Sequence, residues 1–296
     1  EMCIRDSLWD LSQNHHPWLC VEPRITFRYG DYQEICQNYL PEDYDRDSMG
    51  YTVIGSVHIE AEWDSTNPVA ETRWLETITP ECGHPLVVVA QARLNRDDIE
   101  DVLRAHAASP NVRGVRHKPA ASPTAYNAKR GGAGSMDDPR WRDGFSNLSN
   151  FEFSFDLQIP FWHLDQAAEL ARDFPRTTII LNHARLPVNR DRESLIPWRN
   201  ALEMLAAEPN SAIKISGLGQ LGQPWTAESN SNVVKDAISI FGVNRCMFGS
   251  NFPVDRLCGT FDEIYRGFNE IVADYPEQDR DKLFRSNAAE YYRMSF

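Results

Sequence analysis

Two short apolar stretches decide the fold. TTIIL at residues 177–181 runs directly into Asn182 and His183, and CMFGS at residues 246–250 runs into Asn251. Short continuous apolar runs bounded by turn residues are typical of strands buried on both faces, as in a parallel sheet. In barrels and open α/β sheets, active sites are built at the carboxyl edge of such strands. The two strand ends therefore predict an enzyme and mark its active face.

Strand-like and helix-like segments alternate from residue 51 onward. Apolar and β-branched segments predict seven strands, at residues 52–59, 86–90, 112–117, 153–159, 177–181, 212–216 and 246–250. Apolar residues at helical spacing predict helices at residues 69–78, 97–108, 164–174, 198–207, 232–241, 261–273 and 279–292. Strands joined by helical crossovers form a parallel sheet with right-handed connections. An eighth strand at the start of the chain would close a (β/α)8 TIM barrel, which typically needs about 250 residues.

The composition narrows the class of function. The 296 residues include 43 acidic and 30 basic ones, which gives a formal net charge of −13, and no long basic run is present. This balance argues against a nucleic-acid partner. The strongest apolar stretch, Leu86–Ala90, is far too short to span a bilayer. A small-molecule substrate is therefore the expected partner, and the sequence does not determine the oligomeric state.

Two further absences limit the chemistry. The chain has no GxGxxG or P-loop motif, so a nucleotide cofactor is unsupported, and no GxSxG motif for a serine-hydrolase elbow. None of the six cysteines has CxxC spacing. We expect reduced thiols in a cytoplasmic protein, each most simply explained as a small buried hydrophobe.

The first seven residues, EMCIRDS, do not fit the start of a natural protein. They lack the charged region and the apolar core of a signal peptide. MCIRDS is also what one reading frame of a common sequencing-library transposon adapter encodes. We therefore expect residues 1–7 to be adapter-encoded. Residues 8–296 are expected to form a single domain whose first strand is truncated or replaced.

Three residues at the marked strand ends are candidates for catalysis. His183 is the strongest, because histidine titrates near neutrality and can serve as a metal ligand or a general base. The alternative is a ring that bonds a neighbouring carbonyl group. Asp255, just past the last strand, either activates water or caps the following turn. Asn251 cannot act as a base, but it can orient a substrate or bind a metal weakly through its carbonyl oxygen.

Other strand ends offer candidates for substrate binding. Arg116 beside His117 suggests an anion site, because arginine can grip a carboxylate with two hydrogen bonds. The alternative for Arg116 is an internal ion pair with Glu60 or Asp156. His58 and Glu60 end an earlier strand, where binding and structural roles are equally open.

Two further features remain, a buried lysine to which we assign a structural role and a long loop whose role is open. Lys214 lies inside an apolar strand, and a buried lysine needs a partner, so we favour a structural ion pair. The polar loop at residues 119–138 contains GGAGS and is unusually long for a compact domain. Such a loop is usually a lid, a binding loop or disordered.

Seven motifs in order along the chain carry a resemblance to a known family. They are LWDL at 8–11 with HPWL at 16–19, VHIEAEW at 57–63, ETRWL at 71–75, GVRH at 114–117, LNH at 181–183, KISGL at 214–218 and MFGSNFPV at 247–254. The set resembles the amidohydrolase-related family, in its branch of lactonase-like, metal-dependent TIM-barrel hydrolases. The resemblance implies a (β/α)8 barrel that hydrolyses a lactone, such as a sugar-acid or aromatic-breakdown intermediate, with activated water. The alternatives are decarboxylation of a cyclic or aromatic acid on the same barrel and a catalytically impaired fragment.

Two departures from the family pattern affect the metal site that the resemblance implies. The family's first strand ends in a His-x-His pair that supplies two metal ligands, and the corresponding positions here are Arg5 and Ser7. Many relatives have aspartate where this chain has Asn251, and the nearest carboxylate is Asp255. The resemblance implies a divalent metal, zinc, with His183 as a remaining ligand. Because the pair is missing, we expect zinc to bind weakly or not at all.

Overall fold

A computed structural model describes residues 2–83, 86–185 and 190–295 of the chain, without the side chains of residues 2–6 and 185. One curved parallel sheet holds the strands in sequence order. The strands are β1 (Met2–Asp6), β2 (Val53–Ile59), β3 (Leu86–Gln91), β4 (Val112–His117), β5 (Ser154–Leu157), β6 (Ile179–Leu181), β7 (Ser211–Ile215) and β8 (Cys246–Phe248). The predicted α/β alternation with a parallel sheet is confirmed.

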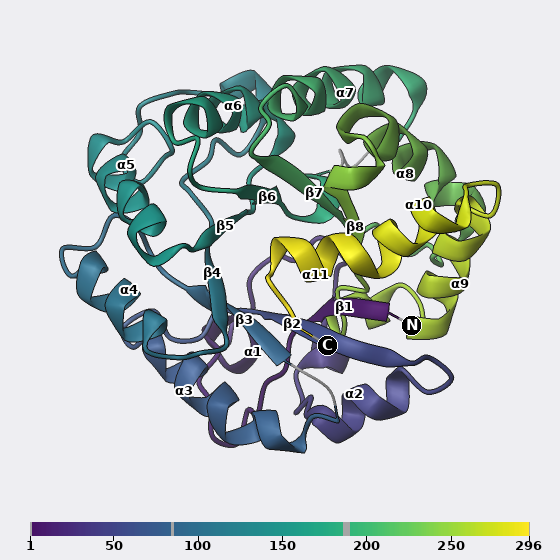
Figure 1. The fold of residues 1–296 in the computed structure, drawn as a ribbon, viewed down its shortest axis with the longest axis horizontal. Helices are drawn as coiled ribbons and strands as arrows, with labels where there is room; N and C mark the ends of the chain where they lie inside the picture. Colours follow the sequence, from purple (N-terminus) through teal and green to yellow (C-terminus); the bar gives the residue numbers. More distant parts are fainter. Residues whose placement is uncertain (1, 84–85, 186–189, 296) are drawn as a thin grey trace.

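Most of the helices surround the outer face of the curved sheet (Figure 1). The helices of the described residues are α1 (Pro17–Cys20), α2 (Pro41–Asp47), α3 (Val69–Ile78), α4 (Ile99–Ala107), α5 (Pro139–Ser146), α6 (Leu164–Asp173), α7 (Arg192–Ala206), α8 (Ala227–Phe241), α9 (Phe261–Ile271), α10 (Glu277–Asp281) and α11 (Asn287–Tyr291). None of the helices in the described ranges is long and apolar enough to cross a membrane.

Several helical segments differ from the sequence prediction, among them α7, α5 and the last stretch of the chain. Helix α7 begins at Arg192 rather than at residue 198, because the side chain of Asp191 accepts a hydrogen bond from the Ser194 backbone and caps the helix. Helix α5 was not predicted, although Asp138 caps it and Pro139 occupies its first position. The stretch predicted as one helix at 279–292 is divided by a π-helical turn at Lys282–Ser286.

The sheet encloses its own apolar cluster and is covered at one end. Inward-facing residues from β2, β3, β6, β7 and β8 pack with Ala288 and Tyr292 of the C-terminal segment. Asn287 donates a 2.7 Å hydrogen bond to the carbonyl oxygen of Cys246, the first residue of β8. Helix α11 therefore crosses the sheet at the amino ends of the strands (Figure 1).

Three buried polar side chains interact with one another inside the curved sheet. Lys214 forms an ion pair with Asp156 and donates a 2.8 Å hydrogen bond to the Tyr292 hydroxyl. None of the three side chains is exposed to solvent. The predicted structural ion pair of Lys214 is confirmed, and the carboxyl ends of the strands are left for the site.

The cysteines differ in burial. Cys246 and Cys258 are buried, as expected for small hydrophobes, whereas Cys36 and Cys82 are only partly buried and Cys20 is exposed. The expectation was therefore wrong for Cys20. All five carry free thiols.

Candidate active site

A cavity of about 210 Å³, the inner cavity, opens at the carboxyl ends of the strands. Four residues predicted from the sequence line it: Glu60 after β2, Arg116 on β4, His183 after β6 and Asn251 after β8. These residues are far apart in the sequence. The curvature of the sheet brings them to one opening, which is the face that the strand ends predicted.

His183 is held at the cavity by the turn that follows β7. Its Nδ1 atom lies 3.2 Å from the hydroxyl oxygen of Ser216, and its side chain is almost completely buried. Gly217 has a φ of +61°, and a Cβ atom there would lie only 2.6 Å from His183 Nδ1. The Ser-Gly dipeptide after β7 therefore provides both a hydrogen-bonding group and the space for the ring.

Asp255 lies behind the wall of the inner cavity. Its Oδ1 atom accepts hydrogen bonds from the Asn251 amide at 2.6 Å and from the Tyr29 hydroxyl at 3.0 Å. Asn251 and Tyr29 both line the cavity, so the buried carboxylate is linked to it through these two side chains. Burial first, and then the charge of Asp255, raise the pKa of Tyr29 well above its usual value, which keeps the phenol neutral.

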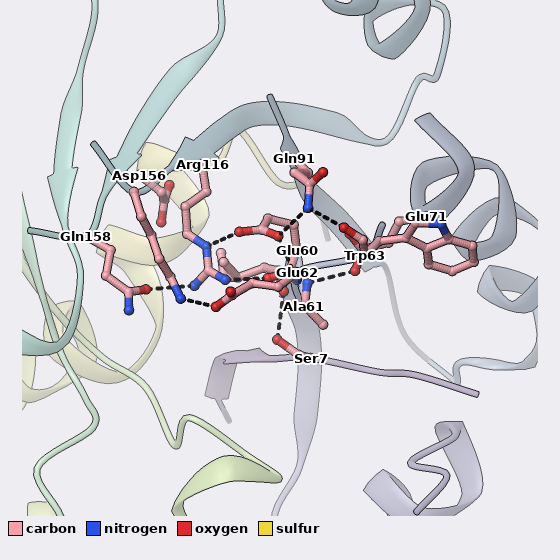
Figure 2. A network of polar contacts seen from close by, with 12 residues as sticks. Ser7, Glu60, Ala61, Glu62, Trp63, Glu71, Gln91, Arg116, Asp156 and Gln158 are labelled. Atoms are coloured by element: carbon pink, nitrogen blue, oxygen red, sulfur yellow. Dashed lines mark hydrogen bonds and ion pairs between the residues drawn. The ribbon is translucent and has the colours of Figure 1, made fainter. Parts of the chain in front are cut away.

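Arg116 and Glu60 form a buried ion pair at the floor of the site (Figure 2). The Nε atom of Arg116 donates to Glu60 Oε1 at 2.5 Å, and Nη2 donates to the Glu60 carbonyl oxygen at 2.6 Å. Nη1 donates to Gln158 at 3.1 Å. Burial raises the pKa of Glu60, but the neighbouring Arg116 charge and hydrogen bonds bring it below its usual value. The internal ion pair predicted as the alternative for Arg116 is therefore made with Glu60, although Arg116 still lines the cavity.

The two remaining predicted histidines lie outside the inner cavity. His117 Nδ1 accepts a 2.9 Å hydrogen bond from the Trp141 indole, and the ring borders a larger neighbouring cavity. Burial, together with the nearby Arg93 charge, lowers the pKa of His117 to about 4, so the ring is neutral at pH 7. His58 lies 3.1 Å from Glu71 of α3, is buried, and lines neither of these two cavities. The structure thus does not bring His58 to the site.

Several lining residues were not among the candidates. Glu62 and Lys118 line the cavity and form an ion pair with each other. The sequence carried a signal for them, since Lys118 directly follows β4 and Glu62 comes three residues after the end of β2. Tyr29 carried no such signal, because it lies in an irregular part of the long segment between β1 and β2.

The described side chains do not fit a metal site of the family type. Within the described ranges, no three His, Cys, Asp or Glu side chains come close enough together to hold a metal ion. Ser7, at one position of the family's histidine pair, donates its hydroxyl to the Ile59 carbonyl oxygen at 2.7 Å. Among the described side chains, His183 is therefore not joined by the other ligands that tetrahedral zinc sites use, and the side chain of Arg5 lies outside them.

Fold and site together define a hydrolase-type α/β enzyme whose active face lies at the carboxyl ends of a curved parallel sheet. Residues 14–294 match the amidohydrolase family model, and the chain belongs to this family. An uncharacterized protein of Sinorhizobium fredii, y4mH, is 38% identical over 97% of this chain and 96% of its own length. An L-fucono-1,5-lactonase of Burkholderia ambifaria is 27% identical over 76% of each chain.

Solved structures share the fold. The crystal structure of an amidohydrolase from Burkholderia multivorans with bound HEPES aligns with a TM-score of 0.81 and 20% identity, covering 99% of both chains. A second crystal structure of an amidohydrolase from that organism contains zinc and aligns with a TM-score of 0.78, at the same identity and coverage. At this identity the likeness establishes the fold and not the ligands.

Proposed function

We propose that this hydrolase opens the ring of a small-molecule lactone, a sugar-acid or aromatic-degradation intermediate. The inner cavity supports this proposal most. His183, Asn251 and Arg116 line it, and Tyr29, which also lines it, is hydrogen-bonded to the Asp255 carboxylate. The cavity offers proton-transfer groups and a cation around one opening. The lactonase among the sequence relatives agrees with such a substrate.

In the proposed reaction, a water molecule in the inner cavity attacks the lactone carbonyl carbon. The water proton passes to the Tyr29 hydroxyl while the Tyr29 proton passes to Asp255. The bond to the ring oxygen then breaks, and His183, which enters the reaction as the protonated imidazolium, donates a proton to that oxygen. The proton left on Asp255 passes to solvent and His183 takes one up again, so that the net reaction adds one water to the lactone. Asn251 positions the Asp255 carboxylate, and Arg116, whose charge is paired with Glu60, contacts the lactone as a hydrogen-bond donor. General acid–base help of this kind contributes about 10²–10⁴-fold to a rate.

The proposal assigns lesser roles to the other predicted residues. Glu60 orients Arg116, His117 borders the larger cavity, and His58 supports β2 against α3. No step passes through a metal, because the described donor groups do not fit one. We also propose a (β/α)8 barrel closed between β1 and β8, since the Ser7 amide after β1 donates to the Phe252 carbonyl after β8 at 3.0 Å. The adapter origin of residues 1–7 and the single domain at 8–296 likewise remain proposals.

A pH-indicator screen of sugar-acid and muconic-type lactones tests the reaction. On a substrate that the parent hydrolyses, His183→Ala and Asp255→Asn should each lower kcat at least about tenfold. Arg104→Gln, on the outer surface of α4, is the control. If both site variants keep full activity, the site is misplaced. Carbon dioxide release in place of proton release from a carboxylated lactone would identify the decarboxylase alternative.

A further inference from the structure

The inner cavity adjoins a larger one, the outer cavity, of about 700 Å³. Both cavities are lined by the same six residues, Trp18, Ile25, Glu60, Glu62, Arg116 and Lys118. The residues Ala133 and Gly134 of the glycine-rich loop also line the outer cavity. The two cavities are therefore neighbouring chambers of one opening at the carboxyl face of the sheet.

The sizes of the two chambers indicate a substrate with two parts. Sites for small molecules usually have volumes of about 300–1,000 Å³. The inner cavity, at about 210 Å³, lies below this range and suits a single small ring. A molecule that fills the opening therefore extends beyond the ring into the outer cavity.

The charged side chains that line the outer cavity favour a substrate whose extension beyond the ring is anionic. Two of its cationic side chains are already paired, Arg116 with Glu60 and Lys118 with Glu62. Arg93, which follows β3, is exposed and lines the cavity.

Among the described residues, no carboxylate lies within ion-pair distance of Arg93. Asp64, the remaining acidic residue of the lining, accepts a 2.9 Å hydrogen bond from the Thr66 amide. This hydrogen bond lowers the pKa of Asp64, and the Arg93 charge lowers it further from beyond ion-pair distance. An arginine without an acidic partner in a cavity is suited to a carboxylate, which it can bind with two hydrogen bonds.

The rest of the lining suits a hydroxylated chain. Pro17, Trp18 and Trp63 supply apolar and aromatic walls. Gln91 donates its amide to the Trp63 carbonyl oxygen at 2.8 Å, which fixes the orientation of the amide. Its own Oε1 atom is buried and has no hydrogen-bond partner in the described part of the chain. Because this oxygen has no exposed surface, the hydroxyl groups of such a chain would instead meet the Ser65 and Asn95 side chains, which also line the outer cavity.

We propose that the outer cavity is a second subsite of the same active site. The substrate is then a lactone with a hydroxylated extension that ends in a carboxylate, and Arg93 binds that carboxylate. This inference rests on the proposed lactone hydrolysis. Arg93 determines specificity, because it contacts the extension and not the carbonyl group that reacts.

A matched substrate pair tests this role. The pair is a δ-lactone with a hydroxylated tail that ends in a carboxylate, and its methyl ester. The parent protein should prefer the acid in kcat/KM by about tenfold or more, as expected for a charge-assisted hydrogen bond. Arg93→Gln should lose most of this preference, chiefly through KM. Arg104→Gln, which also removes one positive charge, should keep it. A preference that survives in Arg93→Gln overturns the inference.

Binding without turnover separates the subsite from the reaction. The probes are the tetrahydropyran analogues of the two lactones, which cannot be hydrolysed, and isothermal titration calorimetry gives their Kd values. Tighter binding of the acid, lost in Arg93→Gln, supports the subsite even if no lactone is turned over, in which case only the proposed reaction fails. Equal binding of acid and ester, with lactones still hydrolysed, overturns the subsite and leaves the reaction in place.

Discussion

The hydroxyl of Tyr29 donates a 3.0 Å hydrogen bond to Oδ1 of Asp255, although the two residues are 226 positions apart in the chain. The bond joins the long segment after β1 to the turn after β8. Both side chains are buried, so the bond is shielded from competing water. It is the contact through which the proposed reaction withdraws a proton from water, and the first prediction concerns it.

Tyr29→Phe should lower both activity and stability. Without the hydroxyl, the proton path to Asp255 is broken and the buried carboxylate loses one donor. We expect kcat to fall about tenfold or more, and the free energy of unfolding to fall by about 1–3 kcal/mol. Steady-state kinetics and denaturant unfolding measure the two effects. Tyr51→Phe is the matched control, since Tyr51 donates to Asp262 at 2.8 Å on the outer surface. An equal loss of kcat in both variants would contradict the proposed path.

Asn251→Asp should make the stability of the protein depend on pH. The Asn251 amide donates to Asp255 at 2.6 Å, so the substitution would place two carboxylates in contact. One of them then has a raised pKa in the folded state. Stability should be near that of the parent at pH 4, where the pair of carboxyl groups still holds one proton, and should fall as the pH rises through that raised pKa.

Thermal unfolding at pH 4 and pH 7 measures this difference. The double variant with Asn251→Asp and Asp255→Asn is the control, because it exchanges the two side chains and restores one amide and one carboxylate. It should recover most of the stability at pH 7. A double variant no more stable than Asn251→Asp would show that the loss does not come from carboxylate contact.

The buried pair of Glu60 and Arg116 should matter far more for stability than the exposed pair beside it. Glu60→Leu leaves a buried guanidinium without its partner, which typically costs about 3–5 kcal/mol. Lys118→Met breaks the partly exposed pair with Glu62, and such pairs contribute about 0–1 kcal/mol. Denaturant unfolding of both variants gives the comparison. Similar losses would mean that burial does not set the energy of the Glu60 pair.

His117 should make the protein less stable in mild acid. Its pKa in the folded state is about 4, against a usual value of 6.5, because burial and the nearby Arg93 disfavour the charged ring. The unfolded chain therefore takes up a proton first, and stability falls between pH 6.5 and pH 4, by about 3 kcal/mol at most. His117→Asn keeps a side-chain acceptor for Trp141 but cannot titrate. Its unfolding free energy should depend less steeply on pH in this window, and an unchanged slope would assign the effect to other groups.

The sequence predicted several strands well because β3, β6 and β8 are mainly apolar runs that are buried along their whole length. His183 and Asn251 could be placed at the site since each directly follows such a run. His58 could not be placed, because a residue near the end of a strand can face either the opening or the surrounding helices. Tyr29 was missed for a different reason: its contact with Asp255 depends on a segment with no periodic pattern. Local sequence patterns thus locate the face of the site, and long-range packing decides which side chains reach it.

Zinc binding tests the departure from the family pattern at the first strand. We expect the parent chain to bind zinc with a Kd above the micromolar range, because His183 has no partner ligands among the described side chains. The histidine pair of the family corresponds to residues 5 and 7 of this chain, and Ser7 lines the inner cavity together with His183. The double variant with Arg5→His and Ser7→His should therefore bring three imidazoles together, which is a known zinc ligand set.

Isothermal titration with zinc should show binding at least about a hundredfold tighter for this variant than for the parent, a gain of about 3 kcal/mol. Submicromolar binding by the parent itself would contradict the expectation.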